Sequence, residues 1–325
     1  MEEIIPKIDR SLILEELTDD RLLRTTNKAA NRIYIIDAHT APNTMREIGR
    51  LREIAFRAAG GGTGKSCDID EFDIMTPPCR QLIVWDPIDQ EIAGGYRFIL
   101  GEDVKITDGR PRIATAHMFD FSQSFLTHCL PQTIELGRSF VATDYQASGK
   151  GQKALYVLDN LWDGLGALTV VYPQVRYLFG KVTMYPSFGH HERDLILGFL
   201  NKHFPDPDHL VTPIHPLECE ADRQEILSLF TGQDFREDYK ILHSLIRQSG
   251  KNIPPLVNAY MSLSPTMRVF GTAINTEFGD VEETGIFLKI SDIFEEKKRR
   301  HIGTYNPEAA NIAACELSHT EKESN

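Results

Sequence analysis

The order of the regular segments in the middle of the sequence constrains the fold of this chain most. Two strand-like runs, residues 81–85 and 91–100, are joined by the short polar segment 86–90, which predicts an antiparallel hairpin. Farther on, a strand-like run at 134–143 is followed by a glycine loop, an amphipathic helix and another strand-like run at 175–184. This combination favours a mixed α/β (α+β) sheet over a fully parallel doubly wound one.

With 325 residues, 41% apolar and 25% charged, the chain is long enough for a large core and has an ordinary globular composition. The predicted parts are a lead-in at 1–31, a core at 32–215, a helical segment with late strands at 216–303 that completes the same domain, and a disordered tail at 304–325. The other predicted elements are strands at 32–38, 268–275 and 285–290 and helices at 44–58, 192–204, 221–230 and 236–248.

The net charge of −12 argues against a nucleic-acid binder and against stable membrane binding, because both anionic partners are recognised by Lys and Arg. We expect no transmembrane helix, since no apolar run approaches roughly 20 residues, and no signal peptide. The five cysteines are scattered and odd in number, so we expect reduced thiols in a cytoplasmic protein. At most, transient contact with a membrane is expected.

The first glycine-rich loop, residues 60–66, ends in the Gly-Lys-Ser of a nucleotide-binding P-loop. However, Ala59 stands where the motif needs a glycine, a predicted helix precedes the loop, and acidic residues that would repel phosphate follow it. We therefore expect no nucleotide here. No metal site is expected either, because the histidines, including His190 and His191, lack partners at ligand spacing.

The second glycine loop, from Gln146 to Gly151, joins a predicted strand to a predicted helix and includes Ser148. Gly149 and Gly151 permit a tight turn whose backbone N–H groups point into one hollow, to which the helix N-terminus adds its own. Lys150 adds positive charge. The loop is therefore a predicted phosphate cradle, with an ordinary structural turn as the alternative.

Five short motifs occur along the chain in one order: Leu-Arg-Glu-Ile-Ala-Phe at 51–56, Asp-Glu-Phe-Asp at 70–73, Gly-Tyr-Arg-Phe at 95–98, Glu-Leu-Gly-Arg at 135–138 and Ile-Pro-Pro-Leu-Val-Asn-Ala-Tyr at 253–260. Together with the glycine loop they resemble the hemolysin-like, ornithine-lipid-synthesis branch of GNAT-fold N-acyltransferases, which is similar in fold to acyl-homoserine-lactone synthases. The resemblance covers residues 32–290. Two positions depart from the pattern: Cys79-Arg80 stands where a histidine is expected, and Gly137 replaces a serine.

The resemblance implies a mostly antiparallel twisted sheet flanked by helices, with a helical C-terminal extension. It implies transfer of a long acyl chain, 3-hydroxylated chains included, from an acyl-carrier-protein or coenzyme A thioester to the α-amine of a small amino acid of the ornithine or glycine type. This is the first step of aminolipid synthesis. The phosphopantetheine thioester is a co-substrate, and no permanently bound cofactor is implied.

Acyl carrier protein, the implied partner, is acidic, so Lys150, Lys153 and the run 297–300 are candidate docking cations. Three alternatives stay open: a small-molecule N-acetyltransferase that uses acetyl-CoA, a signal synthase of the acyl-homoserine-lactone type, and a catalytically silent GNAT-like binding module.

Direct attack of an amine on a thioester, as the resemblance implies, needs a base and oxyanion donors but no Ser or Cys nucleophile. Glu135 is the candidate base, because strand alternation places it on one face with the small residues Gly137 and Ser139. The alternative for Glu135 is a surface carboxylate. Backbone N–H groups near Val141 and Ala142, just before the glycine loop, are the predicted donors.

Arg138 falls on the apolar face of a regular strand, where an unpaired guanidinium would be costly, so we expect a carboxylate partner. The candidate partners are Asp70, Glu71 and Asp73. The predicted ion network, which shapes the acyl-donor and amine pockets or is purely structural, comprises Arg52, Arg97, Arg138, Asp70 and Asp73. In a regular strand Glu135 and Arg138 point apart, so a shared site requires a β-bulge.

Overall fold

A computed structural model describes residues 1–146 and 152–307, and of residues 152–155 only the course of the backbone. The described residues form two compact units, each built from separate stretches of the chain. The first unit contains residues 1–103, 134–176 and the described residues from 295 onward, and the second contains 104–133 and 177–294. The boundary predicted at residue 215 therefore lies inside the second unit.

Five antiparallel strands form the sheet of the first unit, in the order β1-β2-β3-β4-β8. They are β1 (Leu22–Thr25), β2 (Arg32–Ile36), β3 (Arg80–Asp86), β4 (Glu91–Leu100) and β8 (Thr133–Val141). The predicted hairpin and the strands predicted at 32–38 and 134–143 are thus confirmed. β1 corrects the boundary of the predicted lead-in, because a four-residue strand is too short to show an alternating pattern.

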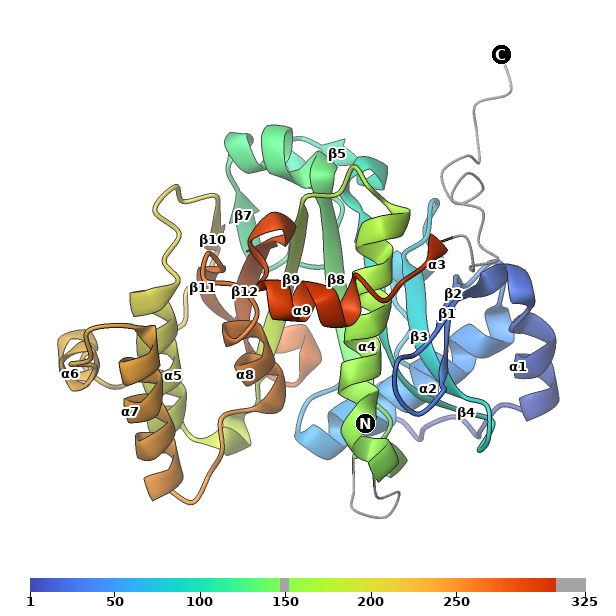
Figure 1. Ribbon diagram of the computed structural model, residues 1–325, viewed down its shortest axis with the longest axis horizontal. Coiled ribbons are helices and arrows are strands. Elements are labelled where there is room, and N and C mark those ends of the chain that lie inside the picture. The colour runs from blue at the N-terminus through green and yellow to red at the C-terminus, as the bar shows by residue number, and fades with distance from the viewer. Residues whose placement is uncertain (147–151, 308–325) are drawn as a thin grey trace. The chain divides into compact units, whose positions relative to one another are not determined.

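Helices cover both faces of this sheet (Figure 1). The helices of the first unit are α1 (Arg10–Glu16), α2 (Pro42–Ala59), α3 (Glu71–Ile74), α4 (Gln152–Val171) and α9 (Glu295–His301). α2 covers one face, since its Arg52 donates a hydrogen bond to Gln81 of β3. α4 covers the other face, where Gly164 lies against Leu82, the neighbour of Gln81. α9 packs on α4.

The second unit has a three-stranded antiparallel sheet, in the order β9-β12-β11, and four helices. Its longer strands are β9 (Tyr177–Met184), β11 (Arg268–Asn275) and β12 (Val281–Lys289). Its short strand pairs are β5 (Ile106–Thr107) with β6 (Arg110–Pro111), and β7 (Phe119–Phe121) with β10 (Val211–Pro213). Its helices are α5 (His190–His203), α6 (Arg223–Leu229), α7 (Phe235–Gln248) and α8 (Pro255–Met261).

The expected mixed fold with antiparallel sheets and flanking helices is confirmed. The ring of Phe125 lies at the centre of the second unit's core, against the rings of Phe121, Phe179, Phe270 and Phe287. In the part of the chain that the structure describes, every helix is too short or too polar to cross a bilayer.

Replacing Gly166 with Ala tests the packing of α9 on α4. A Cβ atom at this position would lie 2.4 Å from the carbonyl oxygen of His301, a backbone atom that cannot turn away. We expect Gly166→Ala to lower the free energy of unfolding by about 1–3 kcal/mol in urea denaturation. At Gly303 a Cβ would come no closer than 3.4 Å to any described neighbour, so Gly303→Ala is the matched control. Equal stability of the two variants would contradict the packing.

Candidate active site

The candidate site lies on the face of the first unit's sheet that α2 covers. Gln81, Arg97 and Gly137 are direct partners on the adjacent strands β3, β4 and β8, so their side chains share this face. Glu135, two residues before Gly137, lies on the same face and is only 3% exposed. A Cβ atom built on Gly137 meets no described atom within 4 Å, so the face is open next to Glu135.

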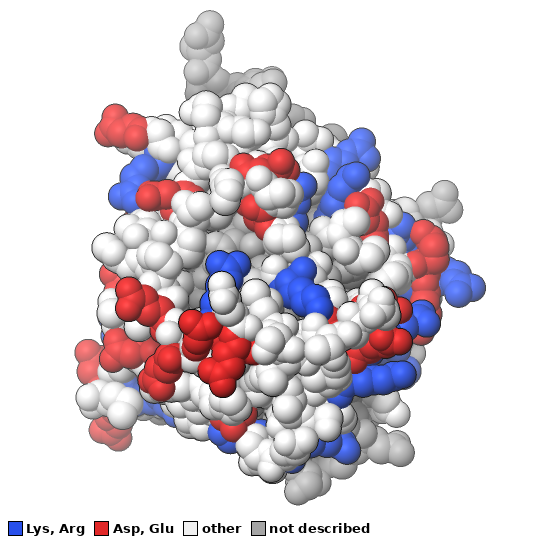
Figure 2. Space-filling model, turned by 90° about the vertical axis from the view of Figure 1, so that its left-hand side faces the viewer, with Lys and Arg blue, Asp and Glu red and all other residues white. Residues whose placement is uncertain are grey.

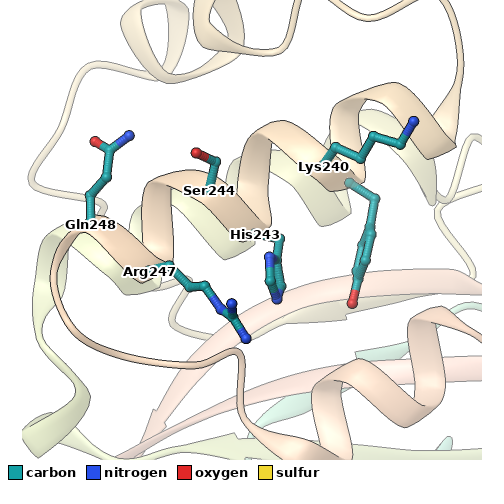
Figure 3. A pocket seen from close by; sticks show the side chains of 6 residues that line it. Lys240, His243, Ser244, Arg247 and Gln248 are labelled. Atoms are coloured by element: carbon teal, nitrogen blue, oxygen red, sulfur yellow. The ribbon is translucent and has the colours of Figure 1, made fainter.

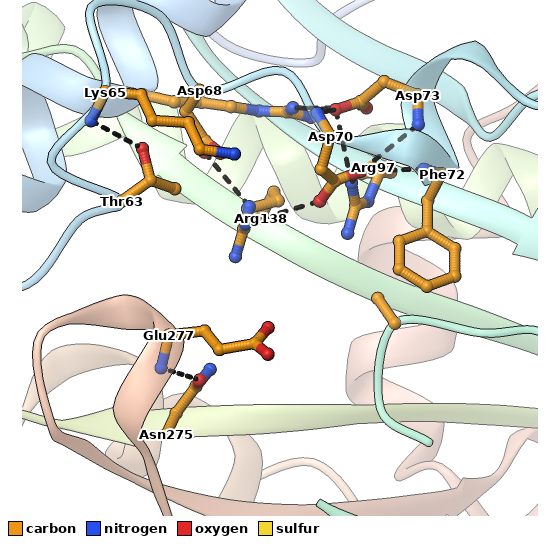
Figure 4. Close-up of polar contacts among 12 residues, drawn as sticks. Thr63, Lys65, Asp68, Asp70, Phe72, Asp73, Arg97, Arg138, Asn275 and Glu277 are labelled. Carbon is orange, nitrogen blue, oxygen red and sulfur yellow. Dashed lines mark hydrogen bonds and ion pairs between the residues drawn. The ribbon is translucent and has the colours of Figure 1, made fainter. Parts of the chain in front are cut away.

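The acidic segment 68–73 contacts this face and is shaped by its own sequence. Asp70 caps α3, because its side chain accepts hydrogen bonds from the N–H groups of Phe72 and Asp73. In return the Asp73 side chain accepts a hydrogen bond from the Asp70 N–H. This reciprocal capping fixes both carboxylates, which also contact arginines of the site (Figure 4).

These carboxylates neutralise two buried arginines. Nη1 of Arg97 lies 2.6 Å from Oδ1 of Asp70 and 3.3 Å from Oδ2 of Asp73. Nη1 of Arg52, a fully buried residue of α2, lies 3.3 Å from Oδ1 of Asp73. Gln81 joins the group by accepting from Arg52 and donating to Asp73 at 2.9 Å. The predicted ion network of these two arginines and two aspartates is therefore present.

A β-bulge in β8 brings Arg138 into the same network. Arg138 and Ser139 together oppose the single residue Tyr96 of β4, and Arg138 has a left-handed φ of 48°. Nε of Arg138 lies 3.0 Å from Oδ2 of Asp68, and its Nη2 lies 3.4 Å from Oδ2 of Asp70 (Figure 4). The prediction that Arg138 lies on the apolar face is wrong, because the bulge interrupts the alternation. The predicted carboxylate partner and the bulge required for a shared site are confirmed.

The network balances its formal charges, with as many arginines as aspartates. Its members are Arg52, Arg97, Arg138, Asp68, Asp70 and Asp73. Burial alone would raise the pKa of Asp70, but Arg97 and Arg138 hold it well below its usual range. Burial opposes the charge of Arg97, yet Asp73 and Asp70 raise its pKa well above the usual value. At Asp68 burial dominates, so the pKa of that carboxyl is raised.

Glu135 adds a further buried carboxylate next to this balanced network. Burial raises the pKa of Cys79, and the charges of Arg97 and Glu135 act on the same thiol in opposite directions, so both lie near it. Cys79 is 1% exposed and occupies the position where the resemblance led us to expect a histidine. A buried thiol with a raised pKa is inert as a nucleophile.

The end of β8 shows which of the backbone N–H groups predicted to contact the acyl donor is available. The N–H of Ala142 donates to the carbonyl of Ala93 at 2.9 Å, so it is engaged in the sheet. Val141 pairs with Gly94, and the alternation of an antiparallel ladder directs its N–H away from β4. The carbonyl of Val141 accepts a hydrogen bond from the side chain of Gln146 at 2.6 Å. Of the two predicted backbone donors, only the N–H of Val141 therefore remains a candidate.

Val141 and Glu135 cannot act on the same carbonyl group. Val141 follows Glu135 by six positions, a distance of about 20 Å along an extended strand. The bulge at Arg138 and Ser139 begins three residues after Glu135, about 10 Å away, which a glutamate side chain and a bound amine can bridge. A bulge also leaves backbone groups outside the ladder. The bulge is therefore a candidate source of backbone donors within reach of Glu135.

Of the two glycine loops, the structure describes the first in full and only the beginning of the second. In the loop at 60–66, the N–H groups of Thr63 and Gly64 donate to the buried Glu53 carboxylate at 3.2 and 2.8 Å. A carboxylate of the protein thus takes the place that a phosphate would need. Of the predicted phosphate cradle, Ser148, Gly149, Lys150 and Gly151 lie outside the described residues, as does the side chain of Lys153. The described ranges contain no group of His, Cys, Asp and Glu side chains that could hold a metal ion.

Asp68 and Gln81 belong to the site although the sequence patterns did not single them out. A bulge between Val84 and Trp85 shifts the pairing of β3 with β4 by one residue. Counting outward from the hairpin turn would therefore have placed Gln81 opposite Tyr96 instead of Arg97. For Asp68 the only available signal was its place in the acidic run 68–73.

Comparison with known proteins gives a consistent result. Residues 51–155 match the family model described as an acetyltransferase (GNAT) domain. A glycine N(alpha)-acyltransferase of Bacteroides thetaiotaomicron is 62% identical over 306 residues, which are 94% of this chain and 91% of the relative. A glycine N(alpha)-acyltransferase of Phocaeicola vulgatus is 58% identical over 318 residues, which are 97% of this chain and 98% of the relative.

Among solved structures, a CoA-dependent acyl-homoserine lactone synthase, BjaI, with SAM and isopentyl-CoA, matches with 9% identity and a TM-score of 0.36. The match covers 85% of this chain and 91% of that one. Similarity this low supports no conclusion about the site.

Removing Asp73 tests whether the network depends on charge balance. The side chains of Arg52 and Arg97 are 1% and 3% exposed, so Asp73→Ala leaves buried guanidinium charge without its partner. We expect a loss of about 3–5 kcal/mol of unfolding free energy in urea denaturation. Lys7→Ala breaks an ion pair with Glu91 whose lysine is 46% exposed, and it should cost less than about 1 kcal/mol. Similar losses of unfolding free energy in both variants would show that the buried network stabilises the fold no more than an exposed ion pair does.

The pH dependence of stability tests the lowered pKa of Asp70. Because this pKa lies below its ordinary value of 3.8, the ionised carboxylate stabilises the folded state above about pH 4, and this contribution is lost as the pH falls through the folded-state pKa. Asp70→Asn should therefore be less stable than the wild type at pH 7, and the difference should shrink below pH 4. A difference that stays constant from pH 7 to pH 3 would contradict the assignment.

Proposed function

The chain belongs to the family of these two relatives and is an acyltransferase with a GNAT domain, and from this premise we propose that it transfers a long acyl chain to the α-amine of glycine. Both relatives are named for that acceptor, and each aligns over more than nine-tenths of this chain. The geometry supports the proposal through one observation: the buried Glu135 lies beside an open stretch of sheet at Gly137, on a strand whose ladder is interrupted at Arg138.

The proposed reaction is a direct attack by nitrogen on the thioester. Glycine arrives with a protonated amine, and the Glu135 carboxylate accepts one of its protons and passes it to solvent. The nitrogen lone pair then forms a bond to the thioester carbon, and the carbon–sulfur bond breaks. The second proton lost from nitrogen ends on the departing sulfur, which leaves as the pantetheine thiol. The products are an N-acylglycine and the free thiol.

Two stretches of β8 backbone have separate roles in this proposal. N–H groups released from the ladder at the bulge of Arg138 and Ser139 stabilise the oxyanion, because they are close enough to Glu135. The outward N–H of Val141 binds the pantetheine arm farther along the strand. Gln146 and the loop up to Gly151 hold the phosphate that begins this arm, as the sequence pattern predicts.

The arginines and aspartates divide between shaping the site and contacting glycine. Arg52 and Asp73 have side chains that are 1% and 0% exposed, so we assign them and Arg97 the task of holding the segment around Asp70 in place. Arg138 has a side chain that is 13% exposed, more than either other arginine. We assign it to the glycine carboxylate, whose negative charge it attracts.

The proposed donor is a long-chain acyl carrier protein, with an acyl-CoA as the alternative source of the same thioester. A long-chain N-acylglycine is an amphiphile, which fits the first step of aminolipid synthesis. The test is to incubate the purified protein with long-chain acyl carrier protein, long-chain acyl-CoA or acetyl-CoA, each with glycine or ornithine, and to identify products by mass spectrometry. We expect long-chain N-acylglycine. Acetylated products alone, or acylation of ornithine without glycine, would overturn the proposal.

Replacing Glu135 with Gln tests its role as the base. We expect kcat to fall by about 10²–10⁴-fold, and the remaining rate to rise with pH as more glycine becomes deprotonated in solution. Glu47→Gln is the control, because Glu47 is also a glutamate 3% exposed in this unit but pairs with Arg50 at 2.6 Å and is not part of the network of arginines and aspartates. If Glu135→Gln forms the same product at an unchanged rate, Glu135 is not the base, although the proposed reaction itself is not refuted.

A further inference from the structure

One face of α7 in the second unit carries a stripe of basic side chains. Arg236, Lys240, His243 and Arg247 follow one another at intervals of four, three and four residues, which places them along one side of the helix. The three Lys and Arg residues of this stripe are exposed, and His243 is partly exposed. At a rise of 1.5 Å per residue, the stripe is about 16 Å long.

The stripe borders an open hollow of about 530 Å³ (Figure 3). The hollow is lined by Tyr239, Lys240, His243, Ser244, Arg247 and Gln248. In Figure 3, His243 and Arg247 point to the same side of the helix. The hydroxyl of Tyr239 is anchored by a hydrogen bond to Asn258 at 2.5 Å.

The opposite face of α7 fixes the helix to its own unit. Leu242 and Ile246 are fully buried. The buried Asp238 lies 2.7 Å from Nζ of Lys202 and accepts from His203 at 2.8 Å, both on α5. The basic stripe therefore lies on the exposed side of a helix whose other side is packed within its own unit.

The cations of the stripe have no acidic partner within the described residues. No ion pair is formed by Arg236, Lys240 or Arg247 in the part of the chain that the structure describes, whereas elsewhere in the second unit Lys181, Arg193 and Arg268 are all paired. In the run 297–300, two of the four cations are neutralised, because Lys298 pairs with Glu295 at 2.8 Å and Arg300 with Asp159 at 2.5 Å.

The whole protein carries a net charge of −12, so a group of exposed cations on one helix face contrasts with the overall charge. On the face shown in Figure 2, Asp and Glu side chains gather in larger groups, and Lys and Arg side chains stand between them. An acidic partner would be repelled by such a surface except at a local group of cations, within the roughly 8 Å over which charges act at physiological salt.

We propose that this basic face of α7 docks the acidic protein that carries the acyl chain on its phosphopantetheine arm; the inference rests on the proposed function. A single phosphate group does not need exposed cations spread over about 16 Å, whereas an acidic protein surface does. A membrane is the weaker occupant, because a helix that lies in a lipid surface exposes a large apolar face. Leu242 and Ile246 of α7 are buried, and Phe235, Ile241 and Leu245 are only partly exposed. The large apolar side chains that are exposed among the described residues all lie outside α7.

Charge reversal with two donors tests the proposal. In Lys240→Glu/Arg247→Glu, kcat/KM with long-chain acyl carrier protein should fall at least about 10-fold, mainly through KM, while kcat/KM with an acyl-pantetheine thioester should stay within 2-fold of wild type. The fall should be largest at low salt. Lys297→Glu/Arg299→Glu is the matched control, because it makes the same change in net charge on α9.

The possible outcomes are distinct. Equal losses with both donors, no loss with either, or a loss confined to the α9 variant would each overturn the docking site. Loss of binding to phosphatidylglycerol vesicles with unchanged carrier-protein kinetics would assign the stripe to lipid instead. A wild-type protein that acylates glycine from neither donor would refute the proposed function itself. Unchanged thermal unfolding of the variants confirms that the helix is intact.

Discussion

Three guanidinium groups that cannot lose their charge are buried or nearly buried on one face of a sheet, and three aspartates accompany them. Removing an ion from water costs several kcal/mol, so such a set is stable only if the charges are paired and hydrogen-bonded. The pairing ties together parts of the chain that are distant in sequence: Arg52 on α2, Asp70 and Asp73 at α3, Arg97 on β4 and Arg138 on β8. The position of the segment over the sheet follows from this balance.

The balance also bears on the proposal that Glu135 is the base. The network beside it is neutral in sum, so Glu135 is the additional carboxylate at a place where the sheet is open at Gly137. The interruption of the ladder at Arg138 serves two purposes. It turns Arg138 toward Asp68 and Asp70, and it releases backbone groups within reach of Glu135. In the proposed reaction, this one local irregularity supplies both the ion pairs of Arg138 and the donors for the oxyanion.

Much of this fold could be predicted from periodicity. The helix at 44–58, the hairpin and the strand at 134–143 are long, regular segments with clear apolar patterns, and the structure confirms them. The strand β1 has four residues and shows no pattern that could be recognised. The side on which Arg138 lies could not be predicted by alternation, because a bulge shifts every later residue to the other face. The engagement of Ala142 depends on its pairing with Ala93, a contact between distant segments.

A crystal structure of the protein with a long-chain N-acylglycine bound would test the central claim most directly. We expect the product amide nitrogen to lie over Gly137, within about 2.6–3.2 Å of the Glu135 carboxylate or linked to it by one water. We expect the glycine carboxylate to lie against Arg138 and the acyl carbonyl to face the bulge. A product bound away from this face of the sheet, with Glu135 out of reach, would contradict the account.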